Sequence, residues 1–325
     1  MVTPASTDAV IAGVNKAGTT SLFVSLSTHP DVAPSAVKET RYFLPARCGQ
    51  PLEPFATYEA YFSDTRDRPV RLEATPSYLY GGAAVATRMA ELLTNPRIIV
   101  ALREPVSRAI SFFTYQKARL RFPADLSFAE YLAAADRLSD DDFLDPENEK
   151  YMAVRGGRYA DFLSDWFEVF GASGIRIVWF EELVTDPTTV IDPLAGWLGI
   201  DAGRFPAGAL SSENRTTGFR NKTFQSVALK ANDRLERVLR RHPDAKRRLR
   251  EFYYRLNGRA TDDHVPSAVR DELGDRYREP NARLAALLST QGIRLASWLD
   301  GQTPAAGAAL DTSSPGEPVD GVRRS

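Results

Sequence analysis

Near its start the chain reads AVIAGVNKAGTTSLFVSLS, from Ala9 to Ser27. The run from Ala9 to Val14 is short, apolar and rich in Val and Ile, which is typical of a buried strand. The segment from Gly13 to Gly18 can turn the chain, and Thr19 to Ser27 has the spacing of a helix. A strand, a glycine loop and a helix in this order are typical of the first unit of an α/β fold.

The same alternation continues along the chain and predicts a P-loop-type parallel β-sheet with helices on both faces. Further strands are expected at Val70–Ala74, Arg97–Leu102 and Ile175–Phe180. The helices expected between them are Gly82–Leu93, Pro105–Lys117, Arg158–Phe170 and Pro187–Leu198. Residues 1–300 should form a single domain. Residues 301–325 should be a disordered tail, because they contain almost no large apolar residue.

The composition narrows the class of protein. A chain of 325 residues with 43% hydrophobic content can bury a large core. Its 41 Lys and Arg against 42 Asp and Glu give a net charge of −1, so no nucleic-acid partner is expected. The lone Cys48 and three scattered histidines predict no metal site and a reducing compartment. With no leader and no apolar run of 18 residues, we expect a cytoplasmic protein without a membrane partner, its oligomeric state open.

Two charged segments interrupt the alternation of strands and helices. Residues 136–149 hold seven acidic residues against the single Arg137, which predicts a solvated loop. Residues 234–259 hold ten Lys and Arg against three acids, interleaved with apolar residues at helical spacing. This second segment fits either the exposed faces of two amphipathic helices or a basic wall for an anionic acceptor or nucleotide phosphate. We expect these two segments to decide which substrate the protein binds.

The loop GVNKAGTTS, residues 13–21, is suited to bind an anion. Its backbone N–H groups and the positive end of the following helix would converge on one point, as they do at phosphate sites. The Walker pattern G-x-x-x-x-G-K-[ST] is not met, because Thr19 follows Gly18 and Lys16 lies two positions before that glycine. The lysine is therefore misplaced for ATP and magnesium. Such a loop can also occur without any ligand.

A second anion site is predicted where the strand Arg97–Leu102 ends. Ligands of open α/β sheets bind outside the carboxyl ends of strands, and Arg103 falls there. Ser111 lies two turns into the next helix, so the guanidinium and the hydroxyl could hold one phosphate. A Walker B strand would instead end in an acid that binds magnesium. Simple pairing of Arg103 with the neighbouring Glu104 is the alternative.

Together these segments resemble the sulfotransferase family that uses 3′-phosphoadenosine 5′-phosphosulfate (PAPS). The resemblance rests on GVNKAGTTSL and REPVSRAISFF and extends over residues 9–290. The other matching segments are HPDV (29–32), KETRYF (38–43), EATPSY (73–78), NRTTGF (214–219) and YREPN (277–281). The chain looks most similar to the branch that contains the heparan sulfate sulfotransferases and their bacterial relatives. The resemblance implies the sulfotransferase fold in a cytoplasmic bacterial member of the family.

The resemblance also implies how PAPS and its product, 3′-phosphoadenosine 5′-phosphate (PAP), are held without a metal. The first loop would hold the 5′-phosphosulfate, and Arg103 with Ser111 would hold the 3′-phosphate. The other residues implied at the nucleotide are Lys16, Ala17, Gly18, Thr19 and Thr20 in the loop, and Arg215, Gly218, Phe219 and Arg220 in a segment that closes over it.

Sulfonate transfer proceeds by in-line displacement, so catalysis consists mainly of positioning and charge stabilisation. Lys16 would neutralise the charge that develops on the departing phosphate. The resemblance makes Glu39 the general base that takes the proton of an acceptor hydroxyl or amine. Glu39 could instead only pair with Lys38 or Arg41. Glu73, at the end of a predicted strand, is a second carboxylate candidate.

Departures from the heparan branch leave the acceptor open. That branch usually carries lysine where Ala74 stands, histidine where Arg41 stands and lysine where Thr217 stands. It also has a disulfide that a single cysteine cannot form. Arg215 and Arg220 flank Thr217 and could supply the missing charge. The acceptor is therefore expected to be a small molecule or a carbohydrate of this protein's own.

Two other functions fit parts of the pattern. A P-loop kinase of a small metabolite would need a Walker lysine and a magnesium-binding acid, which the two motifs do not supply. A nucleotide-binding module without catalysis would tolerate the changes at Ala74 and Thr217. The presence of Lys16, Glu39, Arg103 and Ser111 together in one chain argues against such a module.

Overall fold

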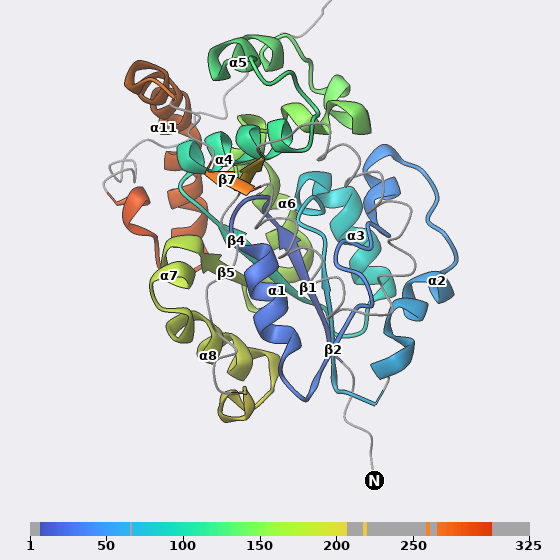
Figure 1. The fold of residues 1–325 in the computed structure, drawn as a ribbon. Coiled ribbons are helices and arrows are strands. Elements are labelled where there is room, and N and C mark those ends of the chain that lie inside the picture. Colours follow the sequence, from blue (N-terminus) through green and yellow to red (C-terminus); the bar gives the residue numbers. More distant parts are fainter. Residues whose placement is uncertain (1–6, 66, 207–216, 220–257, 261–264, 301–325) are drawn as a thin grey trace, which may run out of the picture.

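The computed structural model describes residues 7–65, 67–206, 217–219, 258–260 and 265–300. A parallel five-stranded sheet lies at its centre, with the strand order β2-β3-β1-β4-β5 (Figure 1). The strands are β1 (Thr7–Gly13), β2 (Val32–Pro34), β3 (Val70–Ala74), β4 (Arg97–Leu102) and β5 (Ile175–Trp179). A separate antiparallel pair joins β6 (Thr217–Phe219) to β7 (Gly258–Ala260).

Helices cover both faces of the parallel sheet, which confirms the predicted α/β class. Helix α1 packs against β1, β2 and β3 on one face, and α6 packs against β4 and β5 on the other (Figure 1). The helices are α1 (Thr19–Ser27), α2 (Phe55–Glu59), α3 (Gly82–Leu92), α4 (Pro105–Ala118), α5 (Phe128–Ala135), α6 (Ala160–Gly174), α7 (Phe180–Thr185), α8 (Pro187–Leu198) and α11 (Ser267–Thr290). Strands β1 and β4 lie in the middle of the sheet and are buried except at their first residues.

Most of the elements expected from the sequence are present. Strands β3 and β4 and helices α1 and α8 have the predicted bounds, and the other predicted elements differ by one to four residues at an end. The largest difference is at α6, because the chain breaks at Gly171, whose φ is 65°, and then winds on to Gly174. Strand β2 and helices α2, α5, α7 and α11 were not predicted.

The prediction of a solvated loop at residues 136–149 is right about solvent exposure, because six of its seven acidic residues are exposed, but the segment is not irregular throughout. Short 3-10 turns form at Asp141–Leu144 and Pro146–Tyr151. Arginines from distant parts of the chain hold several of the acids, as Asp136 pairs with Arg276 at 2.9 Å. The basic segment 234–259, except for the backbone of its last two residues, and the expected tail 301–325 lie outside the described residues.

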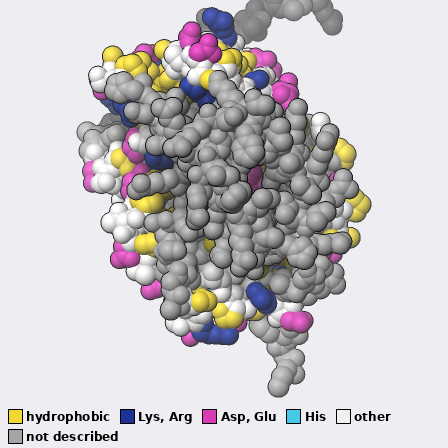
Figure 2. Space-filling view, in the orientation of Figure 1, with side chains coloured by type: hydrophobic (Ala, Val, Ile, Leu, Met, Phe, Trp, Pro, Cys, Tyr) yellow, Lys and Arg dark blue, Asp and Glu magenta, His cyan; other side chains and the backbone are white. Residues whose placement is uncertain are grey.

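The surface of the described residues carries mixed charge. Around the rim of the molecule in Figure 2, both basic and acidic side chains are visible among hydrophobic and other side chains. No helix within the described ranges combines the length and the apolar character that crossing a bilayer demands.

A buried ion pair stabilises the sheet at the amino end of β1. The Asp8 carboxylate is 1% exposed and accepts from Arg71 Nε at 2.6 Å and from Arg71 Nη2 at 2.7 Å. It also accepts from the backbone N–H of Thr94 at 2.6 Å. These bonds join β1 to β3 and to the turn before β4.

Asp8→Ala should therefore lower the free energy of unfolding by about 3–5 kcal/mol, because it leaves the Arg71 charge without its partner. Chemical denaturation of both proteins measures this change. The matched control is Glu91→Ala, which breaks an exposed pair with Arg88 and should cost no more than about 1 kcal/mol. An equal loss in the two variants would contradict the role given to Asp8.

Candidate active site

The strand order brings the two predicted anion sites together. Strand β1 lies between β3 and β4, and the chain passes through β2 and β3 on one side before it reaches β4 on the other. The order therefore reverses between β1 and β4, and such a reversal leaves a crevice at the carboxyl ends of the strands. The glycine loop follows β1 and Arg103 follows β4, so both border this crevice.

The glycine loop turns the chain sharply from β1 into α1. Lys16 and Gly18 both have left-handed backbone, with φ of 72° and 78°. A Cβ on Gly18 would lie 3.0 Å from the Phe180 side chain of α7, so only glycine fits both the conformation and the space. Thr19 and Thr20 form the first turn of α1, whose N–H groups lack partners within the helix and are suited to an anion. Ala17 N–H donates to the carbonyl of Val14 at 3.3 Å.

Lys16 is held against α4 on the other side of the crevice. Its Nζ lies 4.5 Å from the centre of the Tyr115 ring. Burial lowers the pKa of Lys16 to about 8, and the positive charges of Arg103 and Lys38 contribute to the shift. Three cations thus act on one another around this loop. A bound polyanion would relieve their repulsion.

Arg103 is joined to the loop directly. Its Nη1 donates to the carbonyl of Lys16 at 3.2 Å, and its guanidinium lies 4.5 Å from the centre of the Phe180 ring. Burial lowers the pKa of Arg103, against the opposing effect of Glu181. The Glu104 carboxylate, the alternative partner, caps α4 by accepting from the backbone N–H groups of Val106 and Ser107. The phosphate-binding role of Arg103 remains a prediction.

Ser111 lies on the face of α4 that is turned toward the loop. It is half-buried and precedes Tyr115 by four residues, so the two share one face of the helix. Tyr115 contacts Lys16, which places Ser111 on the same side of the crevice. Strand β6, which holds Gly218 and Phe219, also contacts α4. Arg215 and Arg220 lie outside the described residues.

The segment that carries Glu39 runs beside the carboxyl end of β3. The backbone N–H of Glu39 donates to the carbonyl of Ala74 at 2.8 Å. The Glu39 side chain is 46% exposed and pairs with Lys38 at 2.9 Å, whereas Arg41 pairs with Glu149 at 3.1 Å. Because β3 lies beside β1 in the parallel sheet, its carboxyl end and the glycine loop are at the same edge, and Glu39 is tied to that edge. Its role as a base remains a prediction.

Glu73 lies in the protein interior, whereas a second base would have to reach the acceptor. Its side chain has no exposed surface, so it cannot take a proton directly from an acceptor. Three hydroxyl groups, those of Thr40, Thr75 and Tyr78, donate to its Oε1. Burial raises the pKa of Glu73, and these hydrogen bonds oppose that rise. The two threonines stand in the KETRYF and EATPSY segments, but nothing in the sequence indicated that the segments meet.

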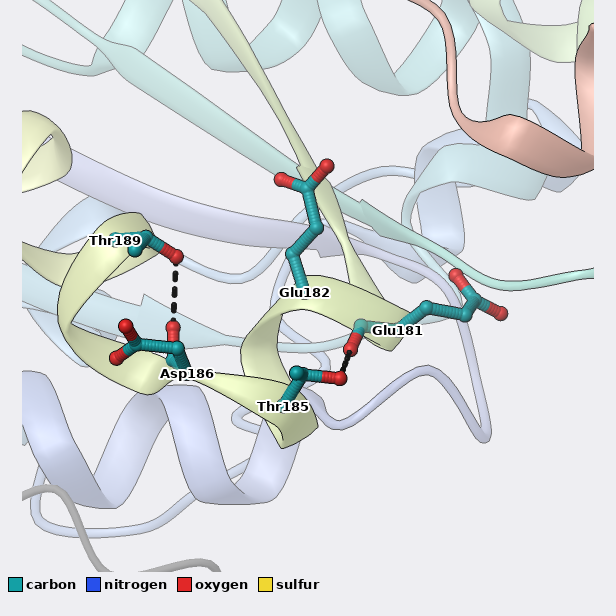
Figure 3. Close-up of a pocket in the computed structure, with 5 residues that line it drawn as sticks. All are labelled: Glu181, Glu182, Thr185, Asp186 and Thr189. Carbon is teal, nitrogen blue, oxygen red and sulfur yellow. Dashed lines mark hydrogen bonds between the residues drawn. The ribbon is translucent and has the colours of Figure 1, made fainter.

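A pocket on α7 and α8 is lined by Glu181, Glu182, Thr185, Asp186 and Thr189 (Figure 3). The Thr185 hydroxyl donates to the carbonyl of Glu181 at 2.7 Å, and the Thr189 hydroxyl donates to that of Asp186 at 2.8 Å. Both hydroxyls are thus engaged within the helices. An acidic lining repels phosphate, so this pocket is not where an anionic nucleotide would bind.

Comparison with known proteins identifies the same family as the motifs. The model of the sulfotransferase domain matches residues 6–244. Human heparan sulfate glucosamine 3-O-sulfotransferase 6 is 33% identical over 192 residues, which cover 59% of this chain and 52% of that protein. Human heparan sulfate glucosamine 3-O-sulfotransferase 3B1 is 29% identical over 253 residues, covering 77% of this chain and 61% of that protein. The chain thus matches little more than half the length of these relatives.

A solved structure shares the fold. The sulfotransferase from Alicyclobacillus acidocaldarius superposes with a TM-score of 0.55 at 24% identity, over 74% of this chain and 95% of that chain. The fold is therefore the α/β sulfotransferase fold. Because the family model also spans most of the sequence, the chain belongs to the sulfotransferase family.

Proposed function

We propose that this protein transfers a sulfonate group from PAPS to a hydroxyl or amine of a carbohydrate or small-molecule acceptor. The observation that carries the proposal is the meeting of Lys16 and Arg103 at the glycine loop, at the switch point of the sheet. Family membership supports the chemistry. The relatives named above act on heparan sulfate glucosamine, which favours a carbohydrate acceptor.

The residues of the crevice fit such a nucleotide. Gly18 allows the left-handed turn that leads the loop into α1, and the first turn of α1 supplies N–H donors for a 5′-phosphate. Arg103 would bind the 3′-phosphate through its planar guanidinium, with the Ser111 hydroxyl as a second donor. Burial makes each of these cations a stronger partner for an anion than it would be in water.

In this proposal Glu39 acts on the acceptor and Lys16 acts on the leaving group. The acceptor oxygen or nitrogen forms its bond to sulfur as the bond from sulfur to the 5′-phosphate oxygen breaks, and the acceptor proton passes to the Glu39 carboxylate. Lys16 stabilises the negative charge left on that phosphate oxygen. Glu39 is exposed enough to meet an acceptor, and Lys16 is half-buried beside the loop. We therefore assign them to opposite ends of the reacting group.

Arg103→Ala should weaken PAP binding about 10- to 100-fold, because it removes charge-assisted hydrogen bonds to the 3′-phosphate. ADP lacks that phosphate, so its affinity should stay the same. Isothermal calorimetry with PAP, ADP and ATP, each with and without magnesium, measures these affinities. The matched control is Arg97→Ala at the opposite end of β4, where the side chain donates to the carbonyl of Ser173. This variant should bind all three nucleotides like the wild type.

The same titrations separate the competing functions. Tight binding of PAP without magnesium supports the sulfotransferase. Preference of the wild type for ATP with magnesium would instead favour a kinase. An equal loss of affinity for PAP and ADP in Arg103→Ala would show that Arg103 does not bind the 3′-phosphate. Turnover of PAPS with an acceptor excludes a module that only binds nucleotide.

A further inference from the structure

A buried hydrogen-bond cluster lies directly behind the segment that carries Glu39. Glu73 Oε1 accepts from the hydroxyls of Thr75 at 2.6 Å, Thr40 at 2.7 Å and Tyr78 at 3.0 Å. Its Oε2 has no hydrogen-bond partner among the described residues. A buried carboxyl group needs hydrogen bonds, and these can be divided between its two oxygens. Here all three go to one oxygen. Three donors on one oxygen fix the relative positions of the groups that supply them.

Thr40 connects this cluster to the crevice. Its hydroxyl also lies 3.1 Å from the Tyr78 hydroxyl, and it is the only member of the cluster that belongs to the KETRYF segment. Glu39 and Arg41 on either side of it are exposed, whereas Thr40 points inward to Glu73. The Thr40 side chain therefore anchors the backbone that carries Glu39 and Arg41.

The backbone around Thr40 needs such an anchor. Glu39 and Arg41 have φ of 67° and 60°, in the left-handed region that residues with a side chain rarely adopt. Such conformations persist only where the surroundings hold them. The holding bonds run from the Glu39 N–H to the carbonyl of Ala74 at 2.8 Å and from the Arg41 N–H to Thr75 Oγ1 at 3.2 Å. The Glu73 cluster closes this set by tying down the residue between them.

We infer that the hydrogen bond from Thr40 to Glu73 positions the Glu39 carboxylate for proton transfer. Glu73 and Thr40 are then positioning residues, which act on the acceptor only through Glu39. This inference rests on the proposed function, since it requires Glu39 to be the base. Burial keeps the Glu73 carboxylate from contacting the acceptor, but it can still act through Thr40 and Glu39.

Thr40→Val tests the inference with little change of shape, because valine keeps the branched side chain and removes only the hydroxyl. The kcat should fall about 10- to 100-fold, the loss expected when a reacting group is misplaced. The KM for PAPS and the affinity for PAP should stay within about twofold, since neither depends on Glu39. Thr40→Ser, which retains a hydroxyl, should recover most of the wild-type kcat. The matched control is Ser35→Ala, whose hydroxyl donates to the carbonyl of Val37 and not to Glu73; it should keep the wild-type kcat.

A double-mutant cycle separates positioning from general damage. In a Glu39→Gln background the base is already lost, so adding Thr40→Val should reduce kcat no further. The donor is PAPS, and the acceptor probe is a heparan sulfate oligosaccharide, whose hydroxyl and amine groups must lose a proton on transfer. Wild-type kcat in Thr40→Val, or the same fold-loss in both backgrounds, would overturn the inference. Wild-type protein that neither binds PAP nor consumes PAPS would overturn the proposed function instead, so the two failures can be told apart.

Discussion

Replacing Glu39 by glutamine should lower kcat by about 10²- to 10⁴-fold, the usual contribution of a general base. Glutamine keeps the size of the side chain and can still accept a hydrogen bond from Lys38, but it cannot take up the acceptor proton. The affinity for PAP should be unchanged, because the nucleotide is expected to contact the loop and Arg103. Steady-state kinetics with PAPS and calorimetry with PAP measure the two quantities on the same preparation.

The Glu149→Gln variant is the matched control for Glu39→Gln. Glu149 is a neighbouring carboxylate whose partner, Arg41, lies two residues from Glu39. Its loss removes a negative charge from the same region without touching the base, so kcat should stay within about threefold of the wild type. Full activity of Glu39→Gln would reduce Glu39 to an ion-pair partner of Lys38. A matching loss in Glu149→Gln would assign the effect to local charge.

The framework of the fold was predictable because its signals are local. Strands buried on both faces of a parallel sheet are continuous apolar runs, and Arg97–Leu102 shows such a run with bounds that the structure reproduces. Helix α8 was equally clear, because Pro187 stands in its first turn and Gly199, with a φ of 78°, ends it. Strand β2, at the edge of the sheet, is only three residues long and is too short to give a periodic signal.

The candidate site was predictable only in part, because its groups meet through the strand order. Lys16 and Arg103 were found from their motifs, but their contact depends on β1 lying beside β4. The ring of Phe180 against Arg103 and Gly18 had no sequence signal at all. The cluster at Glu73 joins residues 33 positions apart in the chain. The pairing of Asp136 with Arg276 likewise joins residues 140 positions apart, so the local charge pattern gave no sign of it.

Lys16→Met should lower kcat by about 10²- to 10³-fold, the loss typical of removing one group that stabilises a developing oxyanion. Methionine retains a long apolar side chain that can still pack on the Tyr115 ring, so the loop keeps its support. Because the leaving oxygen gains its charge only as its bond to sulfur breaks, kcat should fall more than the affinity for PAPS, in which that oxygen is still bonded to sulfur. An equal fall in both would make Lys16 a binding residue without a special role in the transfer.

The pH dependence gives Lys16 a second, independent test. Its pKa of about 8 means that the free protein holds it charged below that pH and neutral above it. The kcat/KM for PAPS reports the free protein and should therefore be level below about pH 8 and fall about tenfold for each further unit. The kcat should hold to higher pH, because a bound anion raises the pKa of the ammonium group. Lys16→Arg stays charged throughout, so its kcat/KM should lose the alkaline fall even if its absolute value is lower. An unchanged fall in that variant would assign the titration to another group and leave Lys16 without its electrostatic role.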